Sequence, residues 1–193
     1  MSINIYTVKH PLVLHWNSYL NNPSINDNEK YEVSNRINMA LIYEASRKSL
    51  KTEKLYIKCI NNIEEVSLIS KRNFYLFCSD LHISQGISKE AKYLIPNINI
   101  YNFLLYFKNK QWDILKSHSI LPKVLKNSDI IILEKQLDTA KLIPVLEYAL
   151  QHEDSNTTLQ ICCTKCKQIE LEVLSNIYPK LSIYTCFIEN TNN

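Results

Sequence analysis

One stretch of the chain, "DIIILEKQLDTAKLIPVLEYAL" (Asp129–Leu150), gives the clearest indication of the architecture. It opens with a dense apolar run, "DIIILE", which is typical of a strand buried on both faces of a parallel sheet. An acidic turn and a helical pattern follow, and Asp138 or Thr139 offers an N-cap oxygen. Because proline suits the first helical position, we expect the regular helix to begin near Ile143, with Pro144 at that position.

The turn between this strand and helix is a candidate phosphate site. In α/β proteins, free backbone N–H groups at such a helix N-terminus commonly bind phosphate. The surrounding loop normally needs glycines, because its backbone adopts unusual angles and approaches the ligand closely. This turn has none, and the whole chain contains one glycine, Gly86, where average usage of about 7% would give about 13. We therefore interpret the turn as an ordinary capped turn at which a phosphate site has been lost.

Strands and helices alternate along the rest of the chain. A helix is predicted where Val33, Ile37, Leu41 and Ala45 recur every four residues. Two further helices are predicted over 84–94 and 167–178. The remaining strands are predicted over 54–60, 73–78, 98–107, 157–163 and 181–189. This order predicts a single α/β domain over 1–193, with a mostly parallel sheet flanked by helices. Its parts are N-terminal helical elements (1–53), a sheet core (54–189) and a polar tail (190–193).

Composition excludes several classes of protein. Hydrophobic residues make up 46% and charged residues 21%, which is normal for a globular domain. No apolar run approaches the roughly 18–20 residues of a membrane span, and the N-terminus lacks the features of a signal peptide. The 22 basic residues are scattered and the net charge is only +3. Nucleic-acid binders concentrate Lys and Arg on one face, so we expect no nucleic-acid partner and no membrane association.

The cysteines and histidines show no strong metal-ligand pattern. "CCTKC" (Cys162–Cys166) contains one Cys-x-x-Cys pair, whereas a zinc site usually needs a second pair or a pair of histidines. A redox motif of this form usually opens a helix after a strand, and that alternative stays open here. Because Cys162 belongs to a predicted buried strand, we favour structural, reduced thiols. No metal site is predicted.

Three segments together resemble the uracil phosphoribosyltransferase family. "VKHPLV" (Val8–Val13) matches its N-terminal signature, and "ALIYEASRKSLKTEKLYI" (Ala40–Ile57) is similar to its "LLTYEA" segment with the Thr-Glu pair that follows. "YPKLSIYTCFIE" (Tyr178–Glu189) is similar to its late "HPDVELYTASID" segment. The resemblance implies a type I phosphoribosyltransferase fold whose N-terminal elements help to form a homodimer. It also implies a reaction of uracil with 5-phosphoribosyl 1-diphosphate and Mg²⁺, giving uridine monophosphate and diphosphate.

The family's phosphoribosyl loop, roughly "DPMLATGGS", aligns with Glu134–Leu142. By this resemblance Glu134 stands where an aspartate would hold the ribose hydroxyls. Asp138 and Thr139 lie in the loop, and Thr139 survives as a possible phosphate donor. Ala140 and Lys141 replace the two glycines, so Lys141 brings a cation without a backbone cradle. Leu142 replaces a hydroxyl residue, and the loop is degenerate.

Two other family segments are also altered. The diphosphate-binding turn "LRAGLGM" corresponds to "LHISQGI" (Leu81–Ile87), in which His82 replaces the arginine and only Gly86 remains. Imidazole is a poor substitute for a permanently charged, bidentate guanidinium, so we expect His82 to be an exposed structural residue. The chain given ends at Asn193, before the "GLGDAGDR"-type segment of the uracil pocket, so the resemblance is to a C-terminally truncated homologue.

The sequence therefore predicts a diverged homologue without uracil transfer activity, retained in a binding or interaction role. The alternative is residual phosphoribosyl transfer to uracil or another base. No catalytic residue is assigned, and no cofactor is expected unless activity is retained, in which case Mg²⁺ and phosphoribosyl diphosphate are required. The expected partners are a second copy of the chain and possible other proteins. Asn, Ile, Lys and Tyr, which have A/T-rich codons, supply 77 of 193 residues, so we expect a plastid-encoded stromal protein, with the bacterial cytoplasm as the alternative.

Overall fold

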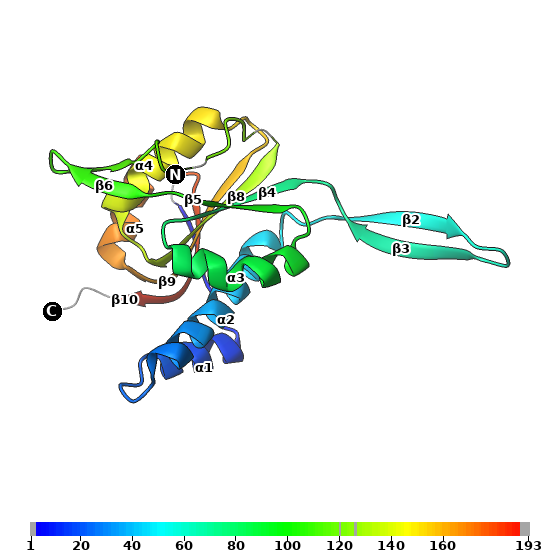
Figure 1. The fold of residues 1–193 in the computed structure, drawn as a ribbon, viewed down its shortest axis with the longest axis horizontal. Coiled ribbons are helices and arrows are strands. Elements are labelled where there is room, and N and C mark those ends of the chain that lie inside the picture. The colour runs from blue at the N-terminus through cyan, green and yellow to red at the C-terminus, as the bar shows by residue number, and fades with distance from the viewer. Residues whose placement is uncertain (1–2, 120, 126, 190–193) are drawn as a thin grey trace.

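The computed structural model describes residues 3–119, 121–125 and 127–189 (Figure 1). The helices are α1 (Pro11–Leu20), α2 (Asp27–Ser46), α3 (Leu81–Leu94), α4 (Thr139–His152) and α5 (Gln168–Ile177). The strands are β1 (Asn4–Thr7), β2 (Thr52–Lys58), β3 (Ile63–Ile69), β4 (Asn73–Cys78), β5 (Ile98–Asn102), β6 (Leu105–Lys108), β7 (Gln111–Ile114), β8 (Ser128–Gln136), β9 (Thr158–Lys167) and β10 (Ser182–Glu189). The polar tail 190–193 lies outside the described residues.

Six strands form one sheet in the order β1-β10-β9-β8-β4-β5, and every neighbouring pair is parallel. The predicted α/β fold with a mostly parallel sheet is confirmed. Strand β8 lies inside the sheet between β9 and β4, as the apolar run "DIIILE" predicted. Ile130, Ile131, Ile132 and Leu133 are all buried, because helices cover both faces of the sheet there.

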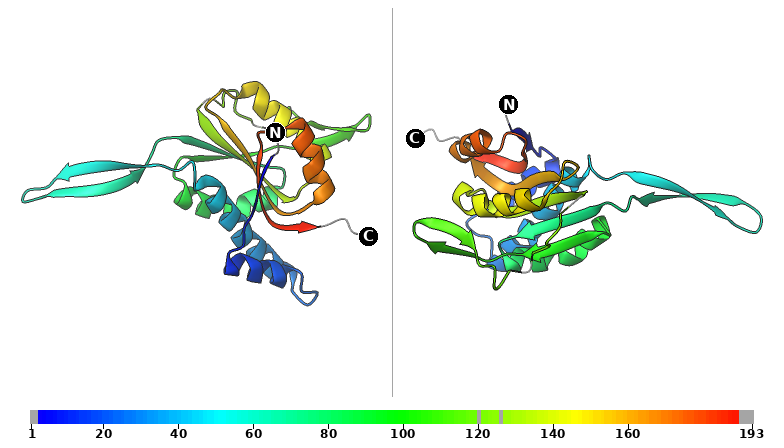
Figure 2. Two further views of the ribbon diagram at one scale, coloured as in Figure 1. Left: turned by 180° about the vertical axis from the view of Figure 1, so that it is seen from behind. Right: turned by 90° about the horizontal axis from the view of Figure 1, so that it is seen from above.

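The helices form one layer on each side of the sheet (Figure 2). Helices α2 and α3 cover one face, where Leu41 and Ile87 join Ile131 and Leu133 in one core cluster. Helices α4 and α5 cover the other face, where a second cluster contains Ile130 and Ile132. Helix α1 packs against α2. The alternation of side chains along β8 therefore supplies two separate hydrophobic cores from one strand.

Helix α4 begins earlier than predicted. It starts at Thr139, and Pro144 lies inside it, so the expected start near Ile143 is wrong. Asp138 caps the helix by accepting a hydrogen bond from the Lys141 N–H at 3.3 Å. The proline removes one helical hydrogen bond. Burial of apolar side chains in the first two turns, such as Leu142 and Val145, offsets that loss.

The single strand predicted over 98–107 is also wrong, because the chain leaves the sheet after Asn102. Phe103 turns into the core, where it is fully buried, and its N–H donates to the carbonyl of Cys78. Strand β6 then pairs with β7 as an antiparallel hairpin outside the main sheet. Asn109 and Lys110 form its turn with positive φ angles of 52° and 64°, as a tight hairpin turn requires.

The predicted internal division of the chain differs from the structure at two places. Strand β1 pairs with β10, so residues 1–53 contribute a strand to the sheet as well as helices. The predicted strand over 54–60 is β2, but it pairs with β3 in a hairpin that projects from the body (Figure 1). The sheet core therefore excludes the segment 52–69. At the other end, β9 continues to Lys167, which places the whole "CCTKC" motif in a strand.

Candidate functional site

The carboxyl ends of β4 and β8 bring three polar side chains together. Ser79, directly after β4, donates its hydroxyl to Glu134 Oε2 at 2.7 Å. Asp80 follows and caps α3, accepting hydrogen bonds from the N–H groups of His82 and Ile83. In open parallel sheets ligands bind outside the carboxyl ends of the strands, so this edge is the candidate site. Glu134 lies near the end of a parallel strand, as the sequence predicted.

Glu134 is the most perturbed carboxyl group of this edge. Burial raises its pKa from 4.5 to about 7, and the negative charges of Asp80 and Asp138 act in the same direction. The hydrogen bond from Ser79 and the charge of Lys141 lower the pKa and only partly compensate. Glu134 is therefore partly protonated near neutral pH, which suits a side chain that exchanges protons.

The raised pKa of Glu134 predicts a loss of stability with rising pH. The folded state holds this proton more strongly than the unfolded chain, so the free energy of unfolding falls between about pH 4.5 and pH 7 and then levels. The pKa shift corresponds to at most about 3 kcal/mol. Urea unfolding at a series of pH values measures it. Glu134→Gln should remove this part of the slope, whereas Glu90→Gln, at an exposed position of α3, should keep it. An unchanged slope in Glu134→Gln would contradict the assignment.

The N-terminus of α4 is occupied by another part of the chain. Glu170, in the first turn of α5, accepts the Thr139 N–H at 2.8 Å through Oε2. The Thr139 hydroxyl donates to the backbone carbonyl of Glu170 at 3.3 Å. Thr139, which the family resemblance assigned to phosphate, is thus buried and bonded to α5. Two carboxylates of the chain, those of Asp138 and Glu170, therefore accept N–H groups at this helix N-terminus.

The remaining predicted positions of the phosphoribosyl loop lie beside Glu134. Lys141 forms an ion pair with Asp138 at 3.3 Å, and its ammonium lies 5.2 Å from the ring centre of Trp112. Trp112 comes from the β6–β7 hairpin, which covers this end of α4. The structure therefore brings together Glu134, Asp138 and Lys141, while Thr139 is held by α5.

His82 lies in the first turn of α3, directly after the segment that follows β4. Its side chain is exposed, and its carbonyl accepts a hydrogen bond from the Tyr31 hydroxyl at 3.3 Å. The segment 81–87, which the resemblance treated as a diphosphate-binding turn, is helical throughout. Its glycine serves helix packing, because a Cβ at Gly86 would lie 2.4 Å from the Tyr31 hydroxyl and 2.5 Å from Asn35 Nδ2.

Sequence reasoning missed Ser79 and Glu170. Each is a common polar residue beside a predicted element, and neither belongs to a recognisable motif. Ser79 becomes relevant only because β4 and β8 are neighbours, and Glu170 only because α5 begins beside the start of α4. Contacts between residues 31 or 55 positions apart leave no local pattern.

The cysteines are mostly buried and hydrogen-bonded weakly to the core. Cys162 Sγ donates to the Leu41 carbonyl at 3.7 Å, and Cys166 Sγ to the Phe187 carbonyl at 3.8 Å. Burial raises the pKa of Cys186 to about 12, which keeps that thiol protonated.

Within the described residues, no group of three or more His, Cys, Asp or Glu side chains is arranged to hold a metal ion. None of the helices in that part of the chain is long and apolar enough to span a membrane.

Solved structures share this fold. A protein of Aquifex aeolicus, AQ2163, superposes with a TM-score of 0.79 at 16% identity, over 98% of this chain and 89% of that protein. A hypoxanthine phosphoribosyltransferase from Trypanosoma cruzi gives a TM-score of 0.51 at 8% identity, over 86% of this chain and 76% of that one. At these identities the likeness establishes a type I phosphoribosyltransferase fold.

Sequence relatives narrow the assignment. A uracil phosphoribosyltransferase homolog of the red alga Pyropia yezoensis is 28% identical over 100% of this chain and 91% of its own length. A homolog from Porphyra purpurea is 26% identical, over 96% and 88%. The uracil phosphoribosyltransferase of Synechocystis is 22% identical, over 99% and 89%. The family model for uracil phosphoribosyltransferase matches residues 7–193. With this match over nearly the whole chain, the protein belongs to the uracil phosphoribosyltransferase family.

Proposed function

We propose that this protein is a family member that does not transfer phosphoribosyl groups to uracil and that acts in a binding or interaction role. One observation carries the proposal: the Glu170 carboxylate occupies the N-terminus of α4. A substrate phosphate at this position would have to displace a carboxylate that already accepts the Thr139 N–H and lies in the favourable field of the helix. The partial positive charge at the N-terminus of α4 is therefore already neutralised by a carboxylate of the same chain.

The rest of the loop supports the same conclusion. Ala140 and Lys141 stand where the resemblance expects glycines, and residues 139–142 of the loop belong to a regular helix instead of an open cradle. Lys141 forms an ion pair with Asp138 and a cation–π contact with the Trp112 ring. A ligand would therefore have to compete with internal partners for both the backbone N–H groups and the cation. A phosphoribosyl diphosphate with a phosphate at this helix N-terminus would require Glu170 to release the Thr139 N–H.

The assay of uridine monophosphate formation tests the proposal. Purified protein is mixed with uracil, phosphoribosyl diphosphate and Mg²⁺, and the Synechocystis uracil phosphoribosyltransferase serves as the positive control. Turnover comparable to that control would refute the proposal.

A second candidate function is residual phosphoribosyl transfer. It is favoured by Glu134, which has a pKa of about 7, contacts Ser79 and stands at the position that the family resemblance assigns to the ribose hydroxyls. In that case Glu134 and Lys141 would contact the phosphoribosyl substrate. Glu170 would first have to release the Thr139 N–H, because this donor is bound to the Glu170 carboxylate.

We place the protein in the plastid stroma of an alga and regard it as plastid-encoded. Two observations support this: relatives come from the red algae Pyropia yezoensis and Porphyra purpurea, and the composition is biased toward A/T-rich codons. A cytoplasmic bacterial protein is the alternative. Locating the gene distinguishes the two.

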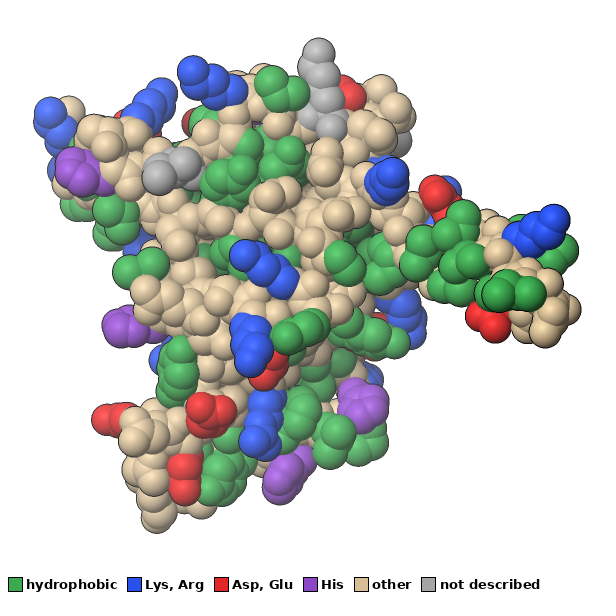
Figure 3. Space-filling model, turned by 45° about the vertical axis from the view of Figure 1, so that its right-hand side comes forward, with side chains coloured by type: hydrophobic (Ala, Val, Ile, Leu, Met, Phe, Trp, Pro, Cys, Tyr) green, Lys and Arg blue, Asp and Glu red, His purple; other side chains and the backbone are tan. Residues whose placement is uncertain are grey.

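The protein also exposes a surface suited to a second copy of itself. Along the β2–β3 hairpin, Leu68, the Leu55–Val66 pair and Ile57 form an apolar stripe on one face, flanked by Glu53 opposite Leu68 and Glu64 opposite Ile57. Leu55, Ile57 and Leu68 are each more than 40% exposed. Figure 3 shows hydrophobic side chains gathered along this projecting arm. An isolated two-stranded hairpin is marginally stable in water, so we propose that the arm packs on a second protomer in a homodimer.

Lysines introduced into the apolar stripe of the arm should produce monomers. For Leu55→Lys with Ile57→Lys, we expect the dimer to dissociate at micromolar concentration, because burial of two charged side chains in an apolar interface is strongly unfavourable. Sedimentation velocity measures the oligomeric state. Tyr56→Lys with Lys54→Gln, on the opposite face of the same strand, is the matched control and should leave the dimer intact. A wild-type protein that is already monomeric would refute the proposed dimer.

A further inference from the structure

A cavity lies at the edge of the sheet opposite the candidate site. It has a volume of about 810 Å³, within the range of small-molecule sites. It is formed around the amino ends of β8, β9 and β10, between the loop after α2 and the loops that follow α4 and α5. Asp129 and Glu134 mark the two edges on one strand, about 16 Å apart at 3.3 Å per residue. The two sites are therefore separate.

The floor of this cavity is polar where the same sheet face is otherwise apolar. Toward the carboxyl ends, Ile131, Cys162 and Tyr184 belong to the core beneath α2. Toward the amino ends, the strand positions on this face are Asp129, Thr158, Gln160 and Ser182. The change coincides with the end of α2 at Ser46, beyond which the helix no longer covers the sheet. Solvent exposure does not explain Asp129, which is fully buried, or Gln160, which is only 7% exposed.

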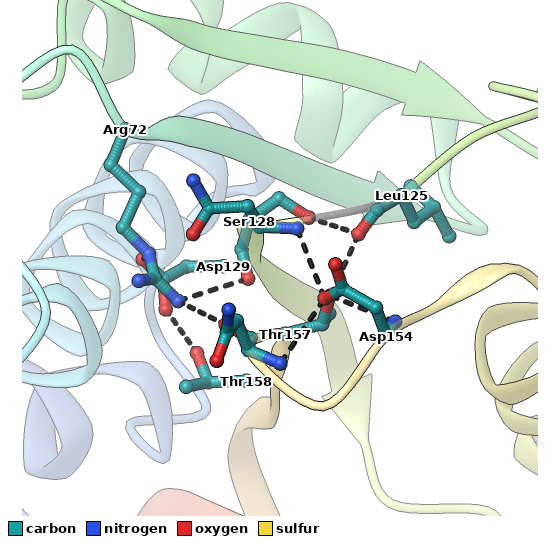
Figure 4. Close-up of polar contacts among 9 residues, drawn as sticks. Arg72, Leu125, Ser128, Asp129, Asp154, Thr157 and Thr158 are labelled. Carbon is teal, nitrogen blue, oxygen red and sulfur yellow. Dashed lines mark hydrogen bonds and ion pairs between the residues drawn. The ribbon is translucent and has the colours of Figure 1, made fainter.

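One half of the polar floor is accounted for by internal contacts, which Figure 4 shows. Arg72, just before β4, forms an ion pair with Asp129 and donates to the carbonyls of Ser128 and Asn156. Thr158 donates to the other oxygen of Asp129. This network joins the beginnings of β4, β8 and β9 and leaves Asp129 neutralised. It explains two of the floor residues as structural.

Gln160 is not accounted for in this way. Its Oε1 atom is buried and has no hydrogen-bond partner among the described residues. Its neighbour across β10 is Ser182, which also lines the cavity. A buried amide without a partner destabilises a protein, so an apolar side chain of the same length would serve the fold better. Oε1 is closed to solvent although the Gln160 side chain lines the cavity, so the oxygen gains a partner only if the amide rotates toward a polar molecule bound there.

A cation is held at the rim of the same cavity. Lys48, in the loop after α2, donates to the Tyr6 hydroxyl at 3.0 Å, and its ammonium lies 4.3 Å from the centre of the Tyr6 ring. Tyr6 is itself stacked on Tyr184 at 4.8 Å, so its ring is fixed by the sheet. The hydrogen bond to Tyr6 raises the pKa of Lys48. Since an ammonium has three donors, Lys48 is positioned and retains donors for a ligand.

Lys51, close by on the same loop, is a second lysine of the cavity wall. On the opposite wall, Asp154 accepts the N–H groups of Asn127 and Asn156, and burial together with the charge of Asp154 raises the pKa of Glu153, which Lys180 only partly offsets. Among the described residues, neither Lys48 nor Lys51 forms an ion pair with a carboxylate. Lysine ammonium groups are common partners of phosphate.

We infer that this cavity binds a small organic monophosphate. The phosphate lies at Lys48 and Lys51, and the organic part lies against Gln160, whose amide rotates so that Oε1 accepts a hydrogen bond from a hydroxyl or amide of the ligand. Tyr6 acts as a positioning residue for Lys48. The inference does not depend on uracil transfer, because none of these residues belongs to the carboxyl edge of the sheet.

Calorimetric titration with ribose 5-phosphate tests this inference, with ribose and inorganic phosphate as the other two probes. We expect ribose 5-phosphate to bind, ribose to give no signal, and inorganic phosphate to bind more weakly. Lys48→Gln should weaken binding by about tenfold or more, because a charge-assisted hydrogen bond is lost. Tyr6→Phe should weaken it less. Lys92→Gln, on the remote helix α3, is the matched control and should bind as the wild type does.

Gln160→Met separates a ligand contact from a structural role. It keeps the side-chain length and removes the unsatisfied amide, so we expect the Tm without ligand to rise by about 2–4 °C and the affinity for ribose 5-phosphate to fall. A lower Tm with unchanged affinity would assign Gln160 to the fold and overturn the inference. So would binding that survives Lys48→Gln but is lost in Lys141→Gln, since the phosphate would then lie at the carboxyl edge. Absence of binding by the wild-type chain would also overturn it, without bearing on the uracil assay.

Discussion

Purified protein with uracil, phosphoribosyl diphosphate and Mg²⁺ is expected to form no uridine monophosphate above background. Departure of the diphosphate requires donors and cations that are already in place around the developing charge. Here His82 stands in place of the arginine of the family motif, and the N-terminus of α4 already holds Glu170. The loss of one such donor typically costs about 10²–10³ in rate, so two independent losses place turnover near zero.

Restoring the loop alone should not recover activity. Ala140→Gly with Lys141→Gly returns the glycines that the family resemblance expects, but the Glu170 carboxylate still accepts the hydrogen bond of the Thr139 N–H. Adding Glu170→Ala frees that donor, and we expect this triple variant to gain phosphoribosyl diphosphate binding without measurable transfer, because His82 is unchanged. The variants are compared with the Synechocystis enzyme in the same assay. Robust turnover by the unmodified chain would contradict the proposal and favour residual phosphoribosyl transfer.

Removing the charge of Arg72 should cause the largest loss of stability. The Asp129 side chain is 1% exposed, and Arg72 is its ion-pair partner. Arg72→Met leaves a buried carboxylate with only the Thr158 hydroxyl, and breaking a buried pair in this way costs about 3–5 kcal/mol. Arg72 also bridges two strand-start loops through the Ser128 and Asn156 carbonyls, which lose their donor. We expect Tm to fall by about 6–20 °C at 2–4 °C per kcal/mol.

Two controls distinguish the buried charge from the loss of a long side chain. The double variant Arg72→Met with Asp129→Leu removes both charges and should recover most of the stability, since a buried ion pair and an apolar pair are often similar in energy. Lys54→Ala breaks the exposed ion pair with Glu65 and should cost less than about 1 kcal/mol. Thermal unfolding followed by circular dichroism measures all three. A double variant as unstable as Arg72→Met would show that the unpaired carboxylate is not the cause.

The strands of the main sheet were predictable because a strand buried on both faces consists of consecutive apolar residues, which the sequence shows directly. "DIIILE" and "NFYLFC" are continuous apolar runs, and both lie inside the sheet with helices on each face. The two hairpins were not predictable in the same way. The alternation over 54–60 correctly predicted a strand, but whether that strand joins the main sheet or pairs with β3 outside it depends on long-range packing.

The start of α4 shows how a local rule can be outweighed. Pro144 favoured a helix that begins beside it, yet the helix begins at Thr139. The Asp138 cap and the Glu170 contact stabilise the first turn, and the apolar side chains of that turn are buried against the sheet. Only the cap was visible as a sequence pattern. The carboxylate from α5 enters through tertiary contact.

Residue types and their order thus determined the α/β class, the central place of β8 and the family to which the chain belongs, because these depend on apolar runs and on motifs read along the chain. The tertiary structure alone decided what each loop holds. Glu170 at the N-terminus of α4, Ser79 beside Glu134, and the Gln160 and Lys48 groups around the amino-edge cavity come from segments far apart in the sequence. Their proximity is set by strand order and helix packing. Local propensity does not determine which distant side chain satisfies a given backbone N–H or buried charge.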